Sequence, residues 1–251
     1  MNKIYFPKNI FSHILVNTLD KSEKYSITFL PSASLTKKLY EDFSTVALIP
    51  TSDIITNKDL YISGKVGITF EGFLCNSFIF YEKDKSTINS LRLSGDISTM
   101  EVIFGKILFK ELYNTSVEIV LTSDKTKLKD SNYVITGDDN FLEARYKNGI
   151  SFAEEMVDMI SAPFVNYVLA SQDKDILTEV SNSIFEKVSG LDYNNITLPD
   201  EFPQESRGFI KENISNVFYT LDEQDIEGIN QLTRLPFYHG IIKDIIEVRF
   251  V

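Results

Sequence analysis

The stretch Leu91-Arg-Leu-Ser-Gly-Asp-Ile-Ser-Thr-Met-Glu-Val-Ile-Phe-Gly-Lys-Ile-Leu-Phe109 decides the fold of this chain. Leu91 and Leu93 alternate with a polar residue, which is typical of a short strand. After a polar turn, apolar residues recur at helical spacing, namely Met100, Ile103, Phe104, Ile107 and Leu108. Such a strand, turn and helix form the βα unit of an α/β fold.

The start of this predicted helix carries the residue types that cap helices. Asp96, Ser98 and Thr99 have side-chain oxygens that accept the N–H groups left unpaired at a helix start. If a ligand takes the place of those caps, the N–H groups and the helix dipole form an anion site. The residues alone leave both interpretations open, with a plain cap as the simpler one.

Strands and helices alternate through the rest of the chain. Strands are predicted over 3–6, 25–30, 44–49, 117–121, 132–136 and 164–170, with extended structure over 66–81 that turns or bulges at Gly72. Helices are predicted over 9–19, from Ser32 or Ser34 to residue 40, and over 152–160, 176–184 and 209–218, and a last helix follows a Thr220–Glu223 capping box. This alternation predicts an α/β fold with mostly parallel sheets.

Composition excludes several classes of function. Of 251 residues, 43% are hydrophobic and 24% charged, which is ordinary for a soluble globular protein. The formal charge of −11 argues against nucleic acids and anionic membrane surfaces as partners. A single cysteine, Cys75, and two distant histidines give no spacing suited to a metal, so neither a metal nor a cofactor is predicted. No targeting segment and no run of about 18 apolar residues is present, so we expect a cytoplasmic protein.

Two adjacent carboxylates, Asp138 and Asp139, follow a predicted strand and Gly137. Neighbouring carboxylates point in different directions, so a divalent cation would need further ligands from elsewhere in the chain. We therefore expect a turn at the strand end, with an aspartate capping a short helix and no metal.

Several segments resemble, in the right order, the menaquinone-biosynthesis family of the futalosine route, and most closely its chorismate dehydratases. Thr45-Val-Ala-Leu-Ile-Pro50 is similar to that family's Asp-Val-Ala-Leu-Val-Pro, and Ile135-Thr-Gly-Asp-Asp-Asn-Phe141 is similar to its Leu-Ile-Gly-Asp-Asp-Ala-Leu. Ile68-Thr-Phe-Glu-Gly72 with Ser77-Phe-Ile-Phe80 resembles its Ile-x-x-Asp-Gly-Pro-Val-Arg-Ser-Val-Leu-Leu. Ala162-Pro163-Phe164-Val165 resembles its Leu-Pro-Phe-Val.

The resemblance implies a two-lobed, type II periplasmic-binding-protein-like fold with an interlobe cleft. The chain would cross between lobes near 82–89 and 171–175, so that 1–85 and 173–251 form lobe I and 86–172 form lobe II. It also implies a set of ligand-binding residues at the cleft, namely Asn9, Asn76, Ser77, Ser98 and Thr99. No catalytic residue is identified.

The chain departs from the family where that family binds carboxylates. Tyr5-Phe-Pro-Lys-Asn9 stands in place of Ser-Tyr-Leu-Asn, Cys75 or Asn76 in place of one arginine, and Ser98 in place of another. Each charge-assisted contact to a carboxylate is worth roughly 1.5–3 kcal/mol, so these losses matter. Three hypotheses follow: a lyase converting chorismate to 3-enolpyruvylbenzoate, a non-catalytic module binding a small carboxylate ligand, and an interaction protein with a vestigial cleft.

Overall fold

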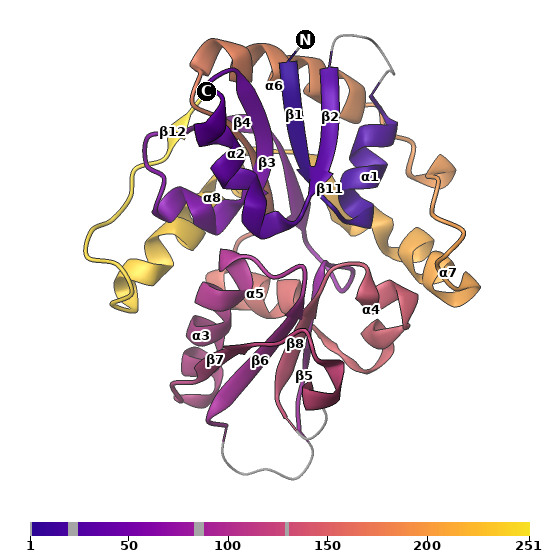
Figure 1. Cartoon of the computed structure of the whole chain (residues 1–251), viewed down its shortest axis with the longest axis vertical. Coiled ribbons are helices and arrows are strands. Elements are labelled where there is room, and N and C mark those ends of the chain that lie inside the picture. Colours follow the sequence, from indigo (N-terminus) through magenta and orange to yellow (C-terminus); the bar gives the residue numbers. More distant parts are fainter. Residues whose placement is uncertain (1, 20–24, 83–87, 129–130) are drawn as a thin grey trace.

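Two β-sheets, each covered by helices, organise the chain into two lobes, as Figure 1 shows. The structure is a computed structural model and describes residues 2–19, 25–82, 88–128 and 131–251. The sheet of lobe I has the strand order β11-β4-β10-β3-β1-β2, with β12 also paired to β4. The sheet of lobe II has the order β7-β6-β8-β5-β9.

The elements of lobe I come from both ends of the chain. They are β1 (Asn2–Pro7), α1 (Ile10–Asn17), β2 (Tyr25–Leu30), η1 (Ser32–Ser34), α2 (Leu35–Glu41), β3 (Thr45–Pro50), η2 (Thr51–Ile55), β4 (Tyr61–Phe70), β10 (Phe164–Ser171), α6 (Lys174–Val188), η5 (Tyr193–Asn195), α7 (Gln204–Asn213), η6 (Ile214–Asn216), β11 (Val217–Thr220), α8 (Glu223–Tyr238) and β12 (Arg249–Phe250). Those of lobe II are β5 (Ser77–Phe80), β6 (Ser90–Gly95), α3 (Thr99–Tyr113), β7 (Glu118–Leu121), η3 (Lys125–Leu128), β8 (Tyr133–Thr136), α4 (Asp139–Leu142), η4 (Arg145–Asn148), β9 (Ile150–Ser151) and α5 (Phe152–Ile160).

The chain changes lobe earlier than expected at both crossings. It leaves the first sheet after β4 and enters the second at β5, and it returns between α5 and β10. The expected first crossing near 82–89 falls largely on 83–87, outside the described residues. The expected return near 171–175 is too late because β10, whose eight residues are all buried, pairs with β3 and β4 of lobe I. Pairing partners far along the chain decide this placement.

Both sheets are mixed rather than mostly parallel. β1 pairs parallel with β2 and β3, and β6 pairs parallel with β7 and β8. The strands next to the crossings, β4, β5 and β10, run antiparallel to their neighbours β3, β8, β9 and β11. A parallel neighbour needs a crossover connection, whereas a strand that arrives from the other lobe is free to pair antiparallel.

Two predictions near the C-terminus are wrong in detail. The helix predicted over 209–218 ends at Asn213, and Val217 belongs to β11, where buried and half-buried residues alternate as in a strand. The last helix, α8, is capped by Asp222 with Asp225 in a capping box, rather than by Thr220. Asp222 lies closer to the apolar stripe of the helix, and its carboxylate accepts from the N–H groups of Gln224 and Asp225.

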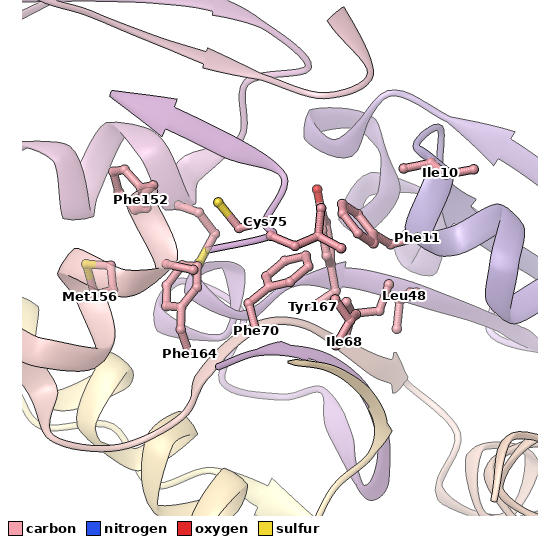
Figure 2. Packing of buried hydrophobic residues seen from close by; sticks show 14 of the residues in the cluster. Ile10, Phe11, Leu48, Ile68, Phe70, Cys75, Phe152, Met156, Phe164 and Tyr167 are labelled. Carbon is pink, nitrogen blue, oxygen red and sulfur yellow. The ribbon is translucent and has the colours of Figure 1, made fainter. Parts of the chain in front are cut away.

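The larger of two apolar clusters runs through both lobes and across the crossings, and the smaller one lies in lobe I. Figure 2 shows Phe70 of β4 among Tyr167, Phe164 and Cys75, and the ring of Phe70 lies 4.9 Å from that of Phe11 in α1. Within the described ranges, the helices lack the length and apolar character that a membrane span needs.

Aromatic contacts join the lobes along one flank. The ring centroids of Phe141 in α4 and Phe11 in α1 lie 6.0 Å apart. Phe209 of α7 stacks on Tyr146 of η4, with 4.0 Å between the ring centroids. In Figure 1, α1, α7 and α4 accordingly share one side of the molecule. These contacts hold the lobes in one arrangement, in which their inner surfaces meet.

Candidate functional site

Polar residues gather where the ends of the parallel strands of the two lobes face each other. Asn9 follows β1 and Ser32 follows β2 in lobe I, while Asp96 follows β6 and Asp138 follows β8 in lobe II. In open α/β sheets, ligands bind beyond the carboxyl ends of the strands. The interlobe surface formed by these turns is therefore the candidate site.

The carboxylate of Asp96 joins the two lobes. It accepts a hydrogen bond from the Ser32 N–H at 2.8 Å and another from Ser32 Oγ at 2.6 Å. Gly95, with φ of +97°, positions the aspartate at the end of β6, where a Cβ on this glycine would lie 2.0 Å from the carbonyl oxygen of Thr136. A lobe II carboxylate thus accepts the N–H and the hydroxyl of Ser32, the first residue of η1, which leads into α2.

A chain of hydrogen bonds continues from Ser32 into the core. Ser32 Oγ lies 2.9 Å from the hydroxyl of Tyr167, and Asn76 Nδ2 lies 3.2 Å from the same hydroxyl. Because Asp96 as a carboxylate accepts the proton of Ser32 Oγ, Ser32 in turn accepts from Tyr167, and Tyr167 accepts from Asn76. The direction of the whole chain is therefore set by the carboxylate at its end.

Asp138 makes a second contact of the same kind. Its Oδ1 accepts the N–H of Ile10, the first residue of α1, at 2.9 Å. The expectation that this aspartate caps the helix after it is wrong, because its side chain makes no hydrogen bond to α4. Burial raises the pKa of Asp138 to about 6, while the Ile10 N–H opposes that shift.

A third contact lies beside the start of α3. Asp53 of η2 accepts hydrogen bonds from Thr36 and from Thr99, and Ser52 Oγ lies 2.5 Å from Thr99 Oγ1. Thr99 belongs to lobe II and the other three to lobe I, so this contact also bridges the lobes.

The helix start that the sequence marked as an anion site is already occupied by the protein's own side chains. Ser98 Oγ accepts from the Met100 N–H at 3.1 Å, and Glu101 Oε2 accepts from the Ser98 N–H at 2.9 Å. Ser77 Oγ donates to the other Glu101 oxygen at 2.9 Å. This capping box leaves a ligand little access to the N–H groups at the start of α3.

The interlobe surface is acidic. Burial raises the pKa of Asp53, Asp96 and Glu101, as it does that of Asp138, and hydroxyl and N–H donors oppose the shift. Among the described residues, no lysine or arginine is a cause of the pKa shift of any of these four groups. Desolvated carboxyls without a cationic partner raise the energy of the folded state, and such groups concentrate at functional sites.

Two buried amide groups close to these contacts are only partly paired. Asn9 caps α1 through Oδ1, which accepts from the Ser12 N–H at 2.9 Å. Its Nδ2 makes no hydrogen bond of ordinary geometry among the described residues, although the side chain lies near enough to the Tyr167 hydroxyl to lower the pKa of that group. Asn76 Oδ1 likewise has no partner in the described part of the chain. Both residues are at most 1% exposed. Buried polar atoms are nearly always paired, so a free donor and a free acceptor here need an explanation.

The structure divides the five residues named from sequence into two groups. Asn9, Asn76 and Thr99 lie at contacts between the lobes or at the crossing, whereas Ser77 and Ser98 bond to Glu101 inside lobe II. Tyr167 was missed, and Ser32 and Asp96 were named only as possible helix caps. A polar residue directly after a predicted strand, as in Ser32 and Asp96, is the signal that marks them.

An open pocket of about 470 Å³ adjoins this surface on lobe II. It is lined by residues on both sides of Asp96 and by the turn after β7, including Gly95, Ile97, Thr122, Lys125 and Asp139. Lys125 is paired with Asp139 at 3.0 Å. In the described residues, no three or more His, Cys, Asp or Glu side chains are grouped to hold a metal ion.

No protein-family model and no curated protein matches the sequence. The fold, in contrast, is similar to solved structures. Protein AF1704 from Archaeoglobus fulgidus has a TM-score of 0.68 at 10% identity, covering 96% of this chain and 98% of that one. The alkanesulfonate-binding protein SsuA from Xanthomonas axonopodis pv. citri, bound to MOPS, has a TM-score of 0.65 at 9% identity, covering 99% and 97%.

The Candida albicans CA3427 gene product, described as having the generic periplasmic binding protein structural fold, has a TM-score of 0.53 at 15% identity, covering 96% of this chain and 90% of that one. At such identities the likeness concerns the fold alone. This chain has a two-lobed, periplasmic-binding-protein-like α/β fold.

Proposed function

We propose that this protein binds a small molecule between its two lobes. The observation that carries the proposal is the pair of buried, unpaired amide atoms, Asn9 Nδ2 and Asn76 Oδ1, beside the interlobe carboxylates. A ligand that offers one acceptor and one donor would complete both hydrogen bonds. Leaving such groups unpaired costs about 1–3 kcal/mol each, and a ligand that pairs with them would recover that cost on binding.

The fold is compatible with this role. A protein of similar fold, SsuA, binds MOPS, although a shared fold does not carry a shared ligand. In a two-lobed protein, ligands that touch both lobes shift the balance between open and closed arrangements. Here the contacts of Asp96 with Ser32 and of Asp138 with Ile10 hold the lobes together. A ligand would either replace these contacts or add further contacts between the lobes.

Dehydration of chorismate receives less support from the site. Chorismate carries two carboxylates, and the interlobe surface already holds two: Asp138, bonded to the N–H of Ile10 next to Asn9, and Asp96, bonded to Ser32. No described lysine or arginine contributes to the pKa of either aspartate. A dianion would therefore meet repulsion without compensating charge-assisted hydrogen bonds.

Thermal unfolding with a panel of small molecules tests the proposal. The panel holds amines, amidines, sulfonates including MOPS, and chorismate, and each is added to the unaltered protein, to Asn76→Ala and to Asn148→Ala. Asn148 is an exposed residue of lobe II and serves as the matched control. A ligand at a hundredfold excess over its Kd stabilises the folded state by about 2.7 kcal/mol.

We expect at least one compound to raise the Tm of the unaltered protein and of Asn148→Ala but not of Asn76→Ala. Loss of chorismate with formation of an enolpyruvylbenzoate would show a lyase instead. If no compound shifts the Tm of correctly folded protein, the proposal fails and the vestigial-cleft hypothesis gains support.

A further inference from the structure

Lobe I presents two backbone N–H groups to lobe II, one at the start of α1 and one in the turn after β2, and each already holds a carboxylate of this chain. Asp138 accepts the N–H of Ile10 at the start of α1, and Asp96 accepts the N–H of Ser32 at the start of η1. Free N–H groups at a helix start form a site for anions, with the helix dipole behind them. Both donors are occupied, so an anionic ligand would have to displace a tethered carboxylate.

The charges that surround these two aspartates are also negative. The pKa of Asp138 is raised mainly by burial and further by the negative charges of Glu201, Asp96 and Asp139. No lysine or arginine among the described residues offsets these charges. The Tyr167 hydroxyl, next to both Ser32 and Asn76, has its pKa raised by burial and by Glu101 and Asp96. A second anion would add to this repulsion, whereas a cation would relieve it.

A buried acceptor at the same place indicates the second property of the ligand. Asn76 donates through Nδ2 to Tyr167, and the chain from Tyr167 through Ser32 to Asp96 fixes that orientation of the amide. Asn76 Oδ1 is therefore left as an acceptor, and no described residue donates to it. An N–H group on the ligand would satisfy it. The acceptor belongs to neither carboxylate, and it too calls for an N–H donor on the ligand.

We propose that Asp96 and Asp138 set the charge selectivity of the interlobe site, excluding anions and selecting a small organic cation with N–H donors, such as an amine or amidine. The proposal rests on the proposed function and names the class of ligand. Asp96 and Asp138 of lobe II are bound to N–H groups of lobe I, where they occupy the positions that a free anion would take. The cation bonds to the remaining lone pairs of these two carboxylates and to Asn76 Oδ1.

Three probes of nearly equal shape separate charge from fit: benzamidine is cationic, benzamide neutral and benzoate anionic. Binding of each is measured by ligand-observed NMR and calorimetry to the unaltered protein, to Asp96→Asn, to Asp138→Asn and to the double variant. Asp244→Asn, which removes an exposed carboxylate from the C-terminal segment, is the matched control for net charge. Circular dichroism and cooperative unfolding establish that each variant is folded.

We expect the unaltered protein and Asp244→Asn to bind benzamidine at least about tenfold more tightly than benzamide, with benzoate weakest. The double variant should lose at least about tenfold in benzamidine affinity and gain affinity for benzoate. If the double variant fails to fold, Asp138→Asn alone decides, because an asparagine there still offers an oxygen to the Ile10 N–H.

Tighter binding of benzoate than of benzamidine by the unaltered protein overturns the inference, as does an unchanged order of affinities in the aspartate variants. Absence of binding by all three probes to the unaltered protein overturns it as well. Failure of the proposed function gives a different result. If the protein binds no small molecule between its lobes, MOPS, chorismate and the rest of the panel leave its Tm unchanged. If only the charge selectivity is wrong, a neutral or anionic ligand still binds, and Asn76→Ala weakens that binding.

Discussion

Ser32 and Asp96, 64 residues apart and in different lobes, are joined by two hydrogen bonds, from the Ser32 N–H at 2.8 Å and from Ser32 Oγ at 2.6 Å. Both oxygens of the carboxylate are used, and the serine hydroxyl also lies 2.9 Å from Tyr167. This contact links the position of lobe I to the ionisation of an aspartate in lobe II. It is the structural reason to place the site between the lobes.

A double-mutant cycle measures this coupling. Ser32→Ala removes the hydroxyl and leaves Asp96 and Tyr167 each without one partner, which should cost about 1–3 kcal/mol of unfolding free energy. Combined with Asp96→Asn, the cycle should give an interaction energy of roughly 0.5–3 kcal/mol in urea unfolding.

The control cycle uses Ser44 and Asp42, whose hydroxyl and carboxylate lie 2.8 Å apart in an exposed turn. Water competes for that exposed pair, so its coupling should stay below about 0.5 kcal/mol. Equal coupling in both cycles would contradict a special role for the interlobe pair.

The stability of the protein should depend on pH through Asp138. Its pKa is about 6 in the folded protein against 3.8 for the unperturbed group, so the folded state binds more protons between these values. The contribution of this group is therefore most favourable below pH 3.8 and is lost as the pH rises through about 6. Asp138→Asn removes the ionisation, so its stability relative to the unaltered protein should rise by roughly 1–3 kcal/mol from pH 4 to pH 8.

Urea unfolding at a series of pH values measures this difference, with exposed Asp244→Asn as the control. A difference that stays constant across the series would show that Asp138 is not desolvated by the lobe contact. A gain in stability at pH 8 would mean that the aspartate is retained at a cost, as residues at functional sites often are.

Gly95 should tolerate no side chain. Its φ of +97° and the 2.0 Å approach of the Thr136 carbonyl oxygen to a Cβ at this position predict strong destabilisation of Gly95→Ala, by about 3 kcal/mol or more. Gly208, in the middle of α7, has nothing within 4 Å of its Cβ position, so Gly208→Ala should stabilise by about 0.5–1 kcal/mol. Thermal unfolding of the two variants tests the pair, and a mild effect of Gly95→Ala would argue against the geometry of the Asp96 turn.

Local sequence patterns predicted the strands and helices better than they predicted which strands pair with one another. The strand and helix predicted around Leu91 and Met100 match β6 and α3, because alternation and helical spacing are properties of a short stretch. The lobe to which β10 belongs could not be predicted, because a buried, mostly apolar strand does not reveal its partners until the other strands are placed.

The site shows the same division. Asp96 and Asp138 were recognised as residue types that cap helices, and each does serve a helix start, but of the opposite lobe. The partners Ser32 and Ile10 are 64 and 128 residues away, and only the folded arrangement of the lobes brings them together. Tyr167 could not be found from sequence, since a tyrosine in a buried strand gives no sign that its hydroxyl reaches the surface between the lobes.

The side-chain amide signals of Asn9 and Asn76 in a two-dimensional ¹⁵N NMR spectrum test the central claim most directly. Their assignment follows from the signals lost in Asn9→Ala and Asn76→Ala, and Asn148 supplies an exposed reference. On titration with benzamidine, both signals should shift progressively to saturation while that of Asn148 stays in place. Saturable binding that leaves the Asn9 and Asn76 signals unmoved would place the ligand elsewhere and contradict an interlobe binding site.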